Sequence, residues 1–367
     1  YDYIVDGIFG TGLNRDIDGI YLDVMKKVEN HKNIIAIDVP SGIYTDSGKS
    51  ANIHIQAKET ITFTHPKLCH FLEDGYSNTG VLHTYPIGHS NDPMANINIQ
   101  LIEKEDVIKK IHPKDKRLNK YSKNRAITIC GSRKYSGALF LSNLSAMRAG
   151  AKILKKIIPS SLAEISYKQL ESIDILLQDE DRGYLGLENF NDVMKELAWS
   201  DTLLIGPGLD ESQNSISLIS KILESYSGRC IIDATGFAPI INEKLRIEDT
   251  PEHSILTPHY SEFSKILNIS IHKLKNNTIE ILDDFSKDLS SRILVLKGPN
   301  TIIMNGSGDK YIISNGNSLL STAGTGDVLA GIIMGYLSNG YNLLDSSILG
   351  VYLHAECSSC LSKMRYE

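Results

Sequence analysis

The feature that most restricts the fold of this chain is a repeated alternation of short apolar runs with segments of helical spacing. In the first part of the chain the apolar runs are Ile4–Phe9, Ile34–Ile37, Ile61–Phe63 and Val81–Ile87. Such runs, bounded by polar turns, predict buried strands. Between the first two, apolar residues recur at helical spacing, namely Ile17, Ile20, Val24 and Val28. This order predicts a βαβ unit with a parallel sheet.

A second alternating series follows a polar, basic stretch between Ile102 and Arg125. Its expected strands are Ala126–Cys130, Thr202–Ile205, Cys230–Asp233, Ser254–Leu256, Ile293–Lys297 and Thr301–Met304. Two helical patterns close the chain, one from Asp327 to Leu337 and one from Leu343 past Leu353. The series predicts an α/β domain with a mostly parallel sheet and helices on both faces. Because 367 residues suffice for two cores, we expect one domain over residues 1–97 and another over residues 98–367.

Charge and cysteine usage narrow the class of protein. A formal net charge of −6 argues against nucleic acid as a partner, because wrapping a polyanion needs a broad basic face. The five scattered cysteines do not form a disulfide framework, which favours a cytoplasmic protein. Cys357 and Cys360 form a C-x-x-C inside a helical pattern with no His at ligand spacing, so a structural role is expected. No apolar run has the length of a membrane span, so no membrane partner is expected.

The segment Thr322–Gly331 carries the strongest chemical signal. It places Gly324 and Gly326 at the start of an apolar helix, directly before Asp327. Glycines let backbone N–H groups converge on an anion, and the helix N-terminus adds partial positive charge, so a phosphate fits there. A plain helix cap is the alternative. The pattern of a P-loop is absent, and so are the third glycine and the preceding strand of a dinucleotide fingerprint.

An aspartate beside such an anion hole can accept a proton from an attacking hydroxyl while the amides stabilise a migrating phosphoryl group. Asp327 is therefore the expected catalytic base. The sequence predicts phosphoryl-transfer chemistry in the second domain.

Five motifs give the second domain a specific resemblance. They are Gly131-Ser132 with Tyr135-Ser136-Gly137-Ala138, Ile205-Gly206-Pro207-Gly208, Thr257-Pro258-His259-Tyr260-Ser261-Glu262-Phe263, Leu296-Lys297-Gly298-Pro299-Asn300-Thr301 and Gly324-Thr325-Gly326-Asp327. In this order they resemble the dehydratase half of the NAD(P)H-hydrate repair enzymes, which belong to the ribokinase-like superfamily. The resemblance implies a ribokinase-like fold from about residue 98 to the C-terminus.

In that family the hydroxyl of a hydrated NADH or NADPH is phosphorylated and phosphate is then expelled. The resemblance implies the substrates NADHX or NADPHX with ADP and Mg²⁺, and the products AMP and phosphate. It makes Asp327 the base on the substrate hydroxyl and places Ala138, Gly208 and His259 against the hydrated dinucleotide. It assigns the nucleotide to Gly326 and to the loop Lys297, Gly298, Pro299, Asn300 and Thr301. Without the resemblance, that loop reads as an exposed hairpin end and His259 as a helix cap.

Two further motifs, Val5-Asp6-Gly7-Ile8-Phe9-Gly10-Thr11-Gly12-Leu13 with Arg15 and Ile37-Asp38-Val39-Pro40-Ser41-Gly42, resemble the epimerase half of the same family. The resemblance implies that the dinucleotide hydrate binds to Asp38 and to the loop Gly10, Thr11, Gly12, Leu13, Asn14, Arg15 and Asp16. It implies a potassium ion on Asp6 and Ser41, whose hard oxygens suit K⁺. Otherwise the strand-end carboxylates Asp6 and Asp38 read equally well as caps.

The first domain is expected to be a partial Rossmann-like α/β domain, because the family's early Asn-rich and Gly-rich loop is absent from the sequence. The chain opens in a strand pattern at Tyr1 with no initiator Met and no leader, so we expect it to begin inside a larger gene product.

The second domain departs from the family pattern at three places. The family's His-Lys-Gly is replaced by Asn119-Lys120-Tyr121, and a usual glycine is replaced by Asp210. A Pro-Gly-Met-Ala run is replaced by Asn317-Ser318-Leu319-Leu320-Ser321. These changes put nucleotide choice in question more than the chemistry. The alternatives are an ATP-dependent vitamin or sugar kinase of the same fold and a noncatalytic nucleotide-binding sensor. By analogy with relatives, a homo-oligomer is expected.

Overall fold

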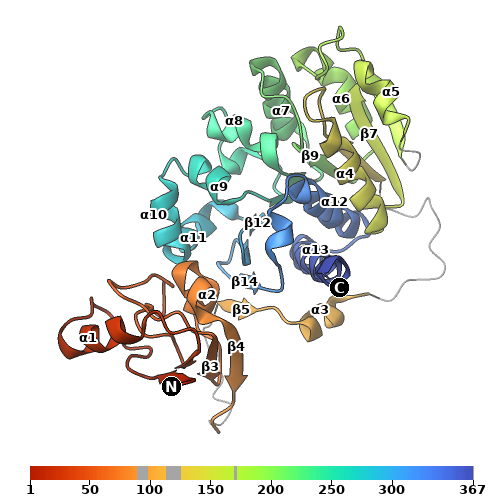
Figure 1. Ribbon diagram of the computed structural model, residues 1–367. Coiled ribbons are helices and arrows are strands. Elements are labelled where there is room, and N and C mark those ends of the chain that lie inside the picture. Colours follow the sequence, from red (N-terminus) through yellow and green to blue (C-terminus); the bar gives the residue numbers. More distant parts are fainter. Residues whose placement is uncertain (89–97, 113–124, 169–171, 367) are drawn as a thin grey trace. The chain divides into compact units, whose positions relative to one another are not determined.

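The computed structural model describes residues 1–88, 98–112, 125–168 and 172–366. They form two compact units, residues 1–97 with 271–281 and residues 98–270 with 282–367 (Figure 1). The Asn119-Lys120-Tyr121 departure lies outside the described residues. Each unit contains its own sheet.

The first unit contains a four-stranded sheet in which every neighbouring pair is parallel. Its strands, in spatial order, are β1 (Ile4–Asp6), β2 (Ile34–Ile37), β3 (Glu59–Phe63) and β4 (Val81–Tyr85). Helices α1 (Gly19–Val28) and α2 (Glu73–Thr79) lie between them in sequence, and α10 (Ile271–Asn276) completes the unit. The predicted βαβ unit is present. Strand β1 is shorter than the predicted run Ile4–Phe9, and β2 coincides with the predicted run Ile34–Ile37.

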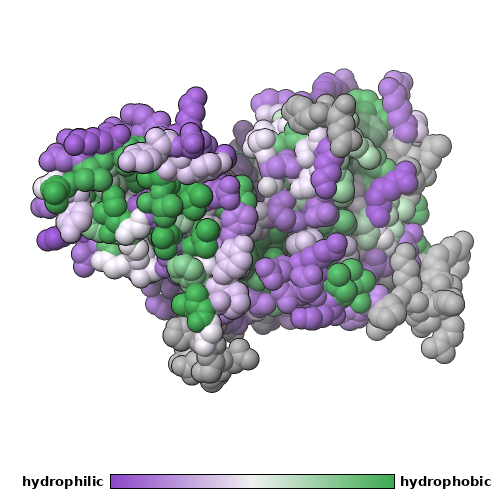
Figure 2. Space-filling model, turned by 60° about the horizontal axis from the view of Figure 1, so that its bottom comes forward, coloured by the Kyte–Doolittle hydropathy of each residue, from purple (hydrophilic) through white to green (hydrophobic). Residues whose placement is uncertain are grey.

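The two faces of this sheet differ in burial. On one face Ile34 and the neighbouring apolar groups pack around Met25 of α1, which is fully buried. The other face keeps large apolar side chains exposed: Val5 63%, Ile37 40%, Val81 59% and Tyr85 55%. Strand pairing aligns Val5 with Ile35 and, through Glu59, with Val81, so these side chains share a face. Figure 2 shows hydrophobic side chains gathered on this part of the surface.

The second unit is built on a ten-stranded sheet of order β5-β14-β13-β12-β11-β10-β9-β6-β7-β8. Its pairs are parallel except β12 with β13 and β13 with β14. The strands are β5 (Ile99–Leu101), β6 (Arg125–Ile129), β7 (Ile153–Pro159), β8 (Ile173–Leu177), β9 (Thr202–Ile205), β10 (Arg229–Ile232), β11 (Ser254–Leu256), β12 (Ile293–Leu296), β13 (Thr301–Asn305) and β14 (Lys310–Ile313).

The longer helices of this unit cover the sheet. They are α3 (Lys104–Lys110), α4 (Ser136–Arg148), α6 (Phe190–Leu197), α7 (Gln213–Ser225), α9 (Tyr260–Ile266), α11 (Thr278–Leu289), α12 (Thr325–Ser338) and α13 (Leu343–Tyr366), with the single turns α5 (Ala163–Ser166) and α8 (Ala238–Ile241). Leu203 and Leu204, neighbours on β9 that point to opposite faces, are both fully buried. Burial of both faces is what a parallel sheet requires, and it confirms the predicted α/β architecture with a mostly parallel sheet.

Helix α12 lies very close to α4. A Cβ added at Gly331 would lie 2.3 Å from the carbonyl oxygen of Ser142, and one added at Gly335 would lie 2.8 Å from that of Ala146. Both distances are far inside van der Waals contact. These glycines therefore let the two helix backbones touch.

Candidate active site

The site is built where strands β9, β10, β11 and β12 end beside the start of α12. Parallel neighbours place their carboxyl ends at one edge of the sheet, which is where open α/β sheets bind ligands. The residues that follow these strands are Gly206, Asp233, Thr257 and Lys297. Asp233 accepts hydrogen bonds from both Thr257 and Lys297.

The N-terminus of α12 has the geometry predicted for an anion hole. Gly324 is the N-cap with φ 92°, a left-handed conformation that favours glycine, and a Cβ there would also lie 2.6 Å from Leu141. The Thr325 hydroxyl donates to the carbonyl of Leu320 at 2.7 Å and so fixes the entry turn. The first N–H groups of a helix have no intrahelical partner and lie at the positive end of its dipole, so this turn can bind phosphate.

Asp327 lies in that first turn and is partly buried. Burial, reinforced by the negative charge of Asp233, raises its pKa to about 6, while Lys297 opposes the shift. A carboxylate with this pKa is a stronger base than an ordinary aspartate and is still ionised at neutral pH. It matches the requirement for a general base that works near pH 7.

Lys297 is the cation of the site. Its Nζ lies 2.7 Å from Oδ1 of Asp233, and a Cβ added at Gly326 would lie 3.5 Å from the same Nζ. Burial lowers the pKa of Lys297, but the negative charges of Asp233, Glu262 and Asp327 and the hydrogen bond to Asp233 together outweigh burial and hold the pKa above its usual value. The ammonium group therefore stays charged directly beside the anion hole.

The predicted nucleotide loop connects β12 to β13. The Lys297 amide donates to the carbonyl of Pro258 at 2.9 Å, which ties the loop to the end of β11. A Cβ at Gly298 would lie 2.9 Å from the ring of Tyr260, and one at Gly316 would lie 3.8 Å from the carbonyl of Pro299. The loop is the turn between antiparallel β12 and β13, with Asn300 buried and Pro299 exposed. Nucleotide binding by this loop remains a prediction.

His259 is the N-cap of α9. Its Nδ1 accepts from the amide of Glu262 at 3.1 Å, and the Glu262 carboxylate accepts from the His259 amide at 2.8 Å. This reciprocal pair is a capping box. The alternative of a helix cap is therefore realised, while 53% of the His259 side chain stays exposed. Contact with a dinucleotide remains a prediction for this residue.

Ala138 and Gly208, which the family resemblance assigns to one cleft, lie in contact with each other. Gly208 has φ 64°, and a Cβ there would lie 2.5 Å from the Cβ of Ala138. The Ser132 hydroxyl donates to the carbonyl of Gly208 at 2.8 Å. Their loops are held in contact, and no larger residue than glycine fits at position 208.

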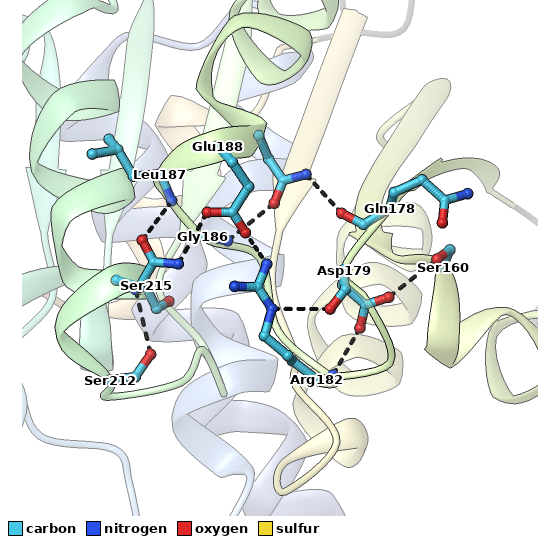
Figure 3. Close-up of polar contacts among 12 residues, drawn as sticks. Ser160, Gln178, Asp179, Arg182, Gly186, Leu187, Glu188, Ser212 and Ser215 are labelled. Carbon is cyan, nitrogen blue, oxygen red and sulfur yellow. Dashed lines mark hydrogen bonds and ion pairs between the residues drawn. The ribbon is translucent and has the colours of Figure 1, made fainter.

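A polar loop over residues 178–189, which the sequence analysis did not single out, lies beside the Ala138 segment. The Arg133 amide donates to the carbonyl of Gly183 at 2.8 Å. Asp179, 1% exposed, anchors this loop by accepting from the Ser161 hydroxyl at 2.6 Å and the Gly183 amide at 2.7 Å. It also accepts from the Ser160 hydroxyl at 3.1 Å (Figure 3). Adjacent residues Glu180 and Asp181 both have positive φ, a strain that recurs at functional sites.

The sequence analysis also missed three side chains of the active site. Asp233 was expected only as a strand end, and Thr257, whose hydroxyl donates to Asp233 at 2.7 Å, only as part of a motif. His354 of α13 hydrogen-bonds to the backbone of Thr325. Burial, together with the charge of Lys297, lowers the pKa of His354 to about 4, so its ring is neutral. A motif does not reveal contacts between distant segments.

In the first unit, Asp6 and Ser41 contact each other as the predicted ion site requires. The Ser41 hydroxyl donates to Oδ1 of Asp6 at 2.6 Å, and the Ser41 amide donates to Oδ2 at 2.8 Å. The Ser41 hydroxyl also lies 3.3 Å from the carbonyl oxygen of Phe9. Three hard oxygens therefore meet at this point.

Asp38 follows β2 with φ 68°, a conformation uncommon for aspartate. It forms an ion pair with Lys67 and accepts from the Thr62 hydroxyl at 2.9 Å. Burial raises the pKa of Asp38, but the hydrogen bonds from Lys67 and Thr62 outweigh burial and bring the pKa below its usual value. The segment Gly10–Asp16 is largely exposed, and a Cβ at Gly10 or Gly12 would meet no atom within 4 Å.

Fold comparisons place the second unit in a known class. A ribokinase-like superfamily protein from Enterococcus faecalis superposes with a TM-score of 0.64 at 23% identity, over 76% of this chain and 93% of that one. An ADP/ATP-dependent NAD(P)H-hydrate dehydratase from Bacillus subtilis, co-crystallised with ATP and Mg²⁺, gives 0.61 at 25% identity, over 73% and 91%. The fold and the glycine-aspartate helix start define a ribokinase-like α/β protein.

Sequence comparisons then give the family. The family model described as NAD(P)H-hydrate dehydratase matches residues 126–367, and the model described as YjeF-related protein N-terminus matches residues 1–69. A bifunctional NAD(P)H-hydrate repair enzyme, Nnr, from Dictyoglomus turgidum is 30% identical over 375 residues, covering 100% of this chain and 72% of that protein. The Nnr of Escherichia coli is 26% identical over 98% of this chain and 67% of its own length. The chain belongs to the NAD(P)H-hydrate repair enzyme family.

Proposed function

We propose that this protein repairs hydrated nicotinamide nucleotides by an ADP-dependent dehydration of the S hydrates NADHX and NADPHX. The products are NADH or NADPH, AMP and phosphate. One observation carries this proposal: Asp327, with a pKa of about 6, stands in the first turn of α12 beside the ammonium group of Lys297. A base, an anion hole and a cation at one point are the parts that phosphoryl transfer to a hydroxyl needs.

The reaction has two steps. Asp327 accepts the proton of the hydroxyl on ring carbon six while the oxygen attacks the terminal phosphorus of ADP, and the bond from that phosphorus to the bridging oxygen breaks, releasing AMP. The lone pair of the ring nitrogen then expels phosphate from carbon six. Loss of a proton from the neighbouring ring carbon restores the dihydropyridine. Phosphorylation matters because hydroxide is a poor leaving group and phosphate a good one.

The two substrates occupy different sides of α12 in this proposal. ADP lies on Gly326 and on the loop from Lys297 to Thr301, where the amides of the helix start and the Lys297 ammonium face its phosphates. The hydrated dinucleotide lies toward Ala138, Gly208 and the exposed ring of His259. The contact between Ala138 and Gly208 and the packing of Gly298 against Tyr260 support this division.

Magnesium enters as part of the nucleotide substrate. No group of three or more His, Cys, Asp or Glu side chains that could hold a metal ion occurs within the described ranges. Mg²⁺ binds readily through substrate phosphates and keeps several waters, so an ADP complex of the ion needs no protein cage.

The first unit is proposed to interconvert the R and S hydrates in the complete bifunctional protein. Asp38 and the Gly10–Asp16 loop would bind the hydrate. Potassium fits the oxygens of Asp6, Ser41 and Phe9, since Asp6 is only 4% exposed and has no ion-pair partner among the described side chains. A bound K⁺ would supply the positive charge that this carboxylate lacks.

A homo-oligomer in the cytoplasm is part of the proposal, by analogy with relatives. No helix within the described ranges is long and apolar enough to span a membrane. The oligomeric state can be measured by light scattering in the presence and absence of ADP.

The test is to incubate the protein with the S hydrate and ADP, and separately with ATP, and to follow recovery of the reduced-nicotinamide absorbance. The expected result is full recovery with one AMP released per hydrate. A kinase would accumulate a phosphorylated product without that absorbance, and a sensor would bind nucleotide without turnover. Either result would overturn the proposal.

A further inference from the structure

Asp233 is the most deeply buried charged group of the active site. It follows β10, and its side chain is 2% exposed. Its backbone is fixed as tightly as its side chain, because a Cβ added at Gly206 would lie 1.8 Å from the Asp233 carbonyl oxygen. Gly206 itself has φ 123°, which only glycine adopts with ease. The ends of β9 and β10 therefore fit against each other at one point.

One carboxylate oxygen of Asp233 holds two groups from the next two strands. Oδ1 accepts from the Thr257 hydroxyl at 2.7 Å, beyond β11, and from the Lys297 ammonium at 2.7 Å, beyond β12. The lysine side chain has a flexible stem of four carbons and loses much rotamer freedom when it is fixed. Within the part of the chain that the structure describes, the hydrogen bond to Asp233 is the contact that directs Nζ toward Gly326.

Other charged and titratable groups also face this lysine. Glu262 on α9 and Asp327 on α12 add negative charge, and the neutral ring of His354 on α13 packs on the side of Thr325. None of these has a hydrogen bond to Nζ in the described contacts, whereas Asp233 has one of 2.7 Å. Asp233 is therefore the group that sets the position of the ammonium.

We infer that Asp233 is a positioning residue for the reaction: it holds the Lys297 ammonium against the phosphate site at the start of α12 and acts only through that lysine. This inference rests on the proposed function and deepens it. It says that the working unit for phosphate binding is the Asp233–Lys297 pair, with Thr257 fixing the orientation of the carboxylate.

The test compares Asp233→Asn, Lys297→Met and the double variant. Loss of one preorganised charged donor is expected to lower kcat about 10²–10³-fold in Lys297→Met. Asp233→Asn keeps the shape and an acceptor for Thr257 but removes the charge, and we expect about a tenfold loss of kcat with a smaller change in the KM for ADP. In the double variant Asp233→Asn should add no further loss, because its effect passes through Lys297. Losses that multiply in the double variant would overturn the inference.

Two controls separate positioning from stability. Lys297→Met leaves a buried carboxylate without its cation, so the thermal midpoint is recorded for each variant, and the double variant, which has neither charge, is expected to be the more stable of the two. Thr257→Val removes one hydrogen bond to Asp233 without changing any charge, and its kcat should fall less than that of Asp233→Asn. An equal fall in both would assign the effect to packing and contradict the inference.

A readout that needs no turnover distinguishes this inference from the proposed function. Binding of Mg-ADP is measured by calorimetry without any hydrate. Asp233→Asn should weaken binding when Lys297 is present and leave it unchanged in the Lys297→Met background. If the wild type binds ADP but never dehydrates the hydrate, the proposed function is wrong. The comparison of ADP binding with and without Lys297 still tests the role of Asp233 in that case. Equal weakening in both backgrounds contradicts that role.

Discussion

Asp327 and Asp38 are both aspartates beside the carboxyl ends of parallel strands, and their surroundings drive their pKa values in opposite directions. Asp327 is buried beside Asp233, and its pKa is raised to about 6. Asp38 is held by Lys67 and Thr62, and its pKa lies below the usual value. The first can therefore accept a proton near neutral pH, whereas the second stays a fixed negative charge. At similar positions beside the two sheets, the second unit therefore has a carboxylate suited to act as a base, and the first unit has one suited to act as a fixed negative charge.

The sheets of the two units also differ in how far their faces are buried. The central strand β9 of the ten-stranded sheet is buried on both faces, so the residues at its carboxyl end lie in surroundings of low polarity. The four-stranded sheet keeps one apolar face exposed, at Val5, Ile37, Val81 and Tyr85. Burial raises the pKa of both carboxyl groups, but at Asp38 the hydrogen bonds and the charge of its neighbours, Lys67 foremost, reverse this effect.

The largest effect expected is on Asp327. Asp327→Asn should lower the dehydration rate by about two to four orders of magnitude, because one positioned base is lost. ADP binding should change little, since the backbone amides and Lys297 hold the phosphates. The matched control is Asp284→Asn on the exposed surface of α11, where the side chain is 83% exposed and the rate should not change. Near wild-type turnover by Asp327→Asn would remove the contrast with Asp38.

Nucleotide should stabilise only one of the two units. ADP at a hundred times its dissociation constant should add about 2.7 kcal/mol to the free energy of unfolding of the unit that binds it. Amide hydrogen exchange with and without Mg-ADP measures this unit by unit. We expect protection around Gly326 and Lys297 and none around Asp38. Equal protection in both units contradicts the assignment of the nucleotide site.

The pH dependence of kcat/KM should report the raised pKa of Asp327. The carboxylate acts in its ionised form, so the rate should fall about tenfold per pH unit below about 6. The same group affects stability with a defined sign. Between its unfolded value of 3.8 and its folded value of about 6 the folded state binds the extra proton, so stability falls as pH rises through this window.

Asp327→Asn removes this dependence. Its thermal midpoint at pH 8 should therefore exceed that of the wild type, although the variant is inactive. A midpoint below that of the wild type at pH 8 would show that Asp327 stabilises the fold and that its pKa is not raised.

The smallest effect is expected on the exposed face of the first sheet. Val81→Thr on β4 should change the free energy of unfolding by less than about 0.5 kcal/mol, because the side chain is already in water. The matched change in the other unit is Val295→Thr on β12, where the side chain is fully buried and the added hydroxyl should cost about 1–3 kcal/mol. Urea titration of both variants measures the difference. A large loss for Val81→Thr would mean that this face is covered in solution.

Much of this architecture could be predicted from apolar runs, and the exceptions have physical causes. The runs Ile34–Ile37, Thr202–Ile205 and Ser254–Leu256 coincide with β2, β9 and β11. Strand β7 was missed because Lys155 and Lys156 interrupt its apolar pattern. Lys156 is nevertheless 0% exposed, and its ammonium lies 3.1 Å from the carboxylate of Asp174. A lysine that is buried with its partner is indistinguishable, in sequence, from one on the surface.

The site shows the same limit. Asp327, Gly326 and Lys297 were expected to act together, because their motifs resemble those of a known family. The contact between Asp233 and Lys297 was not expected, since 64 residues separate them along the chain and only the order of the strands brings them together. Sequence patterns predict which residues end a strand, and strand order decides which of those ends meet.

The close packing of α12 on α4 determines which parts of the site can move. Because Gly331 and Gly335 pack directly against the backbone of α4, sliding or rotation of α12 would create steric clashes, and we expect Asp327 and the first turn of α12 to keep their positions during a reaction cycle. Closure around a bound ligand then has to come from loops that face this helix. A change of substrate size is therefore best engineered in those loops. A larger residue at position 331 or 335 would push α12 away from α4 and displace Asp327.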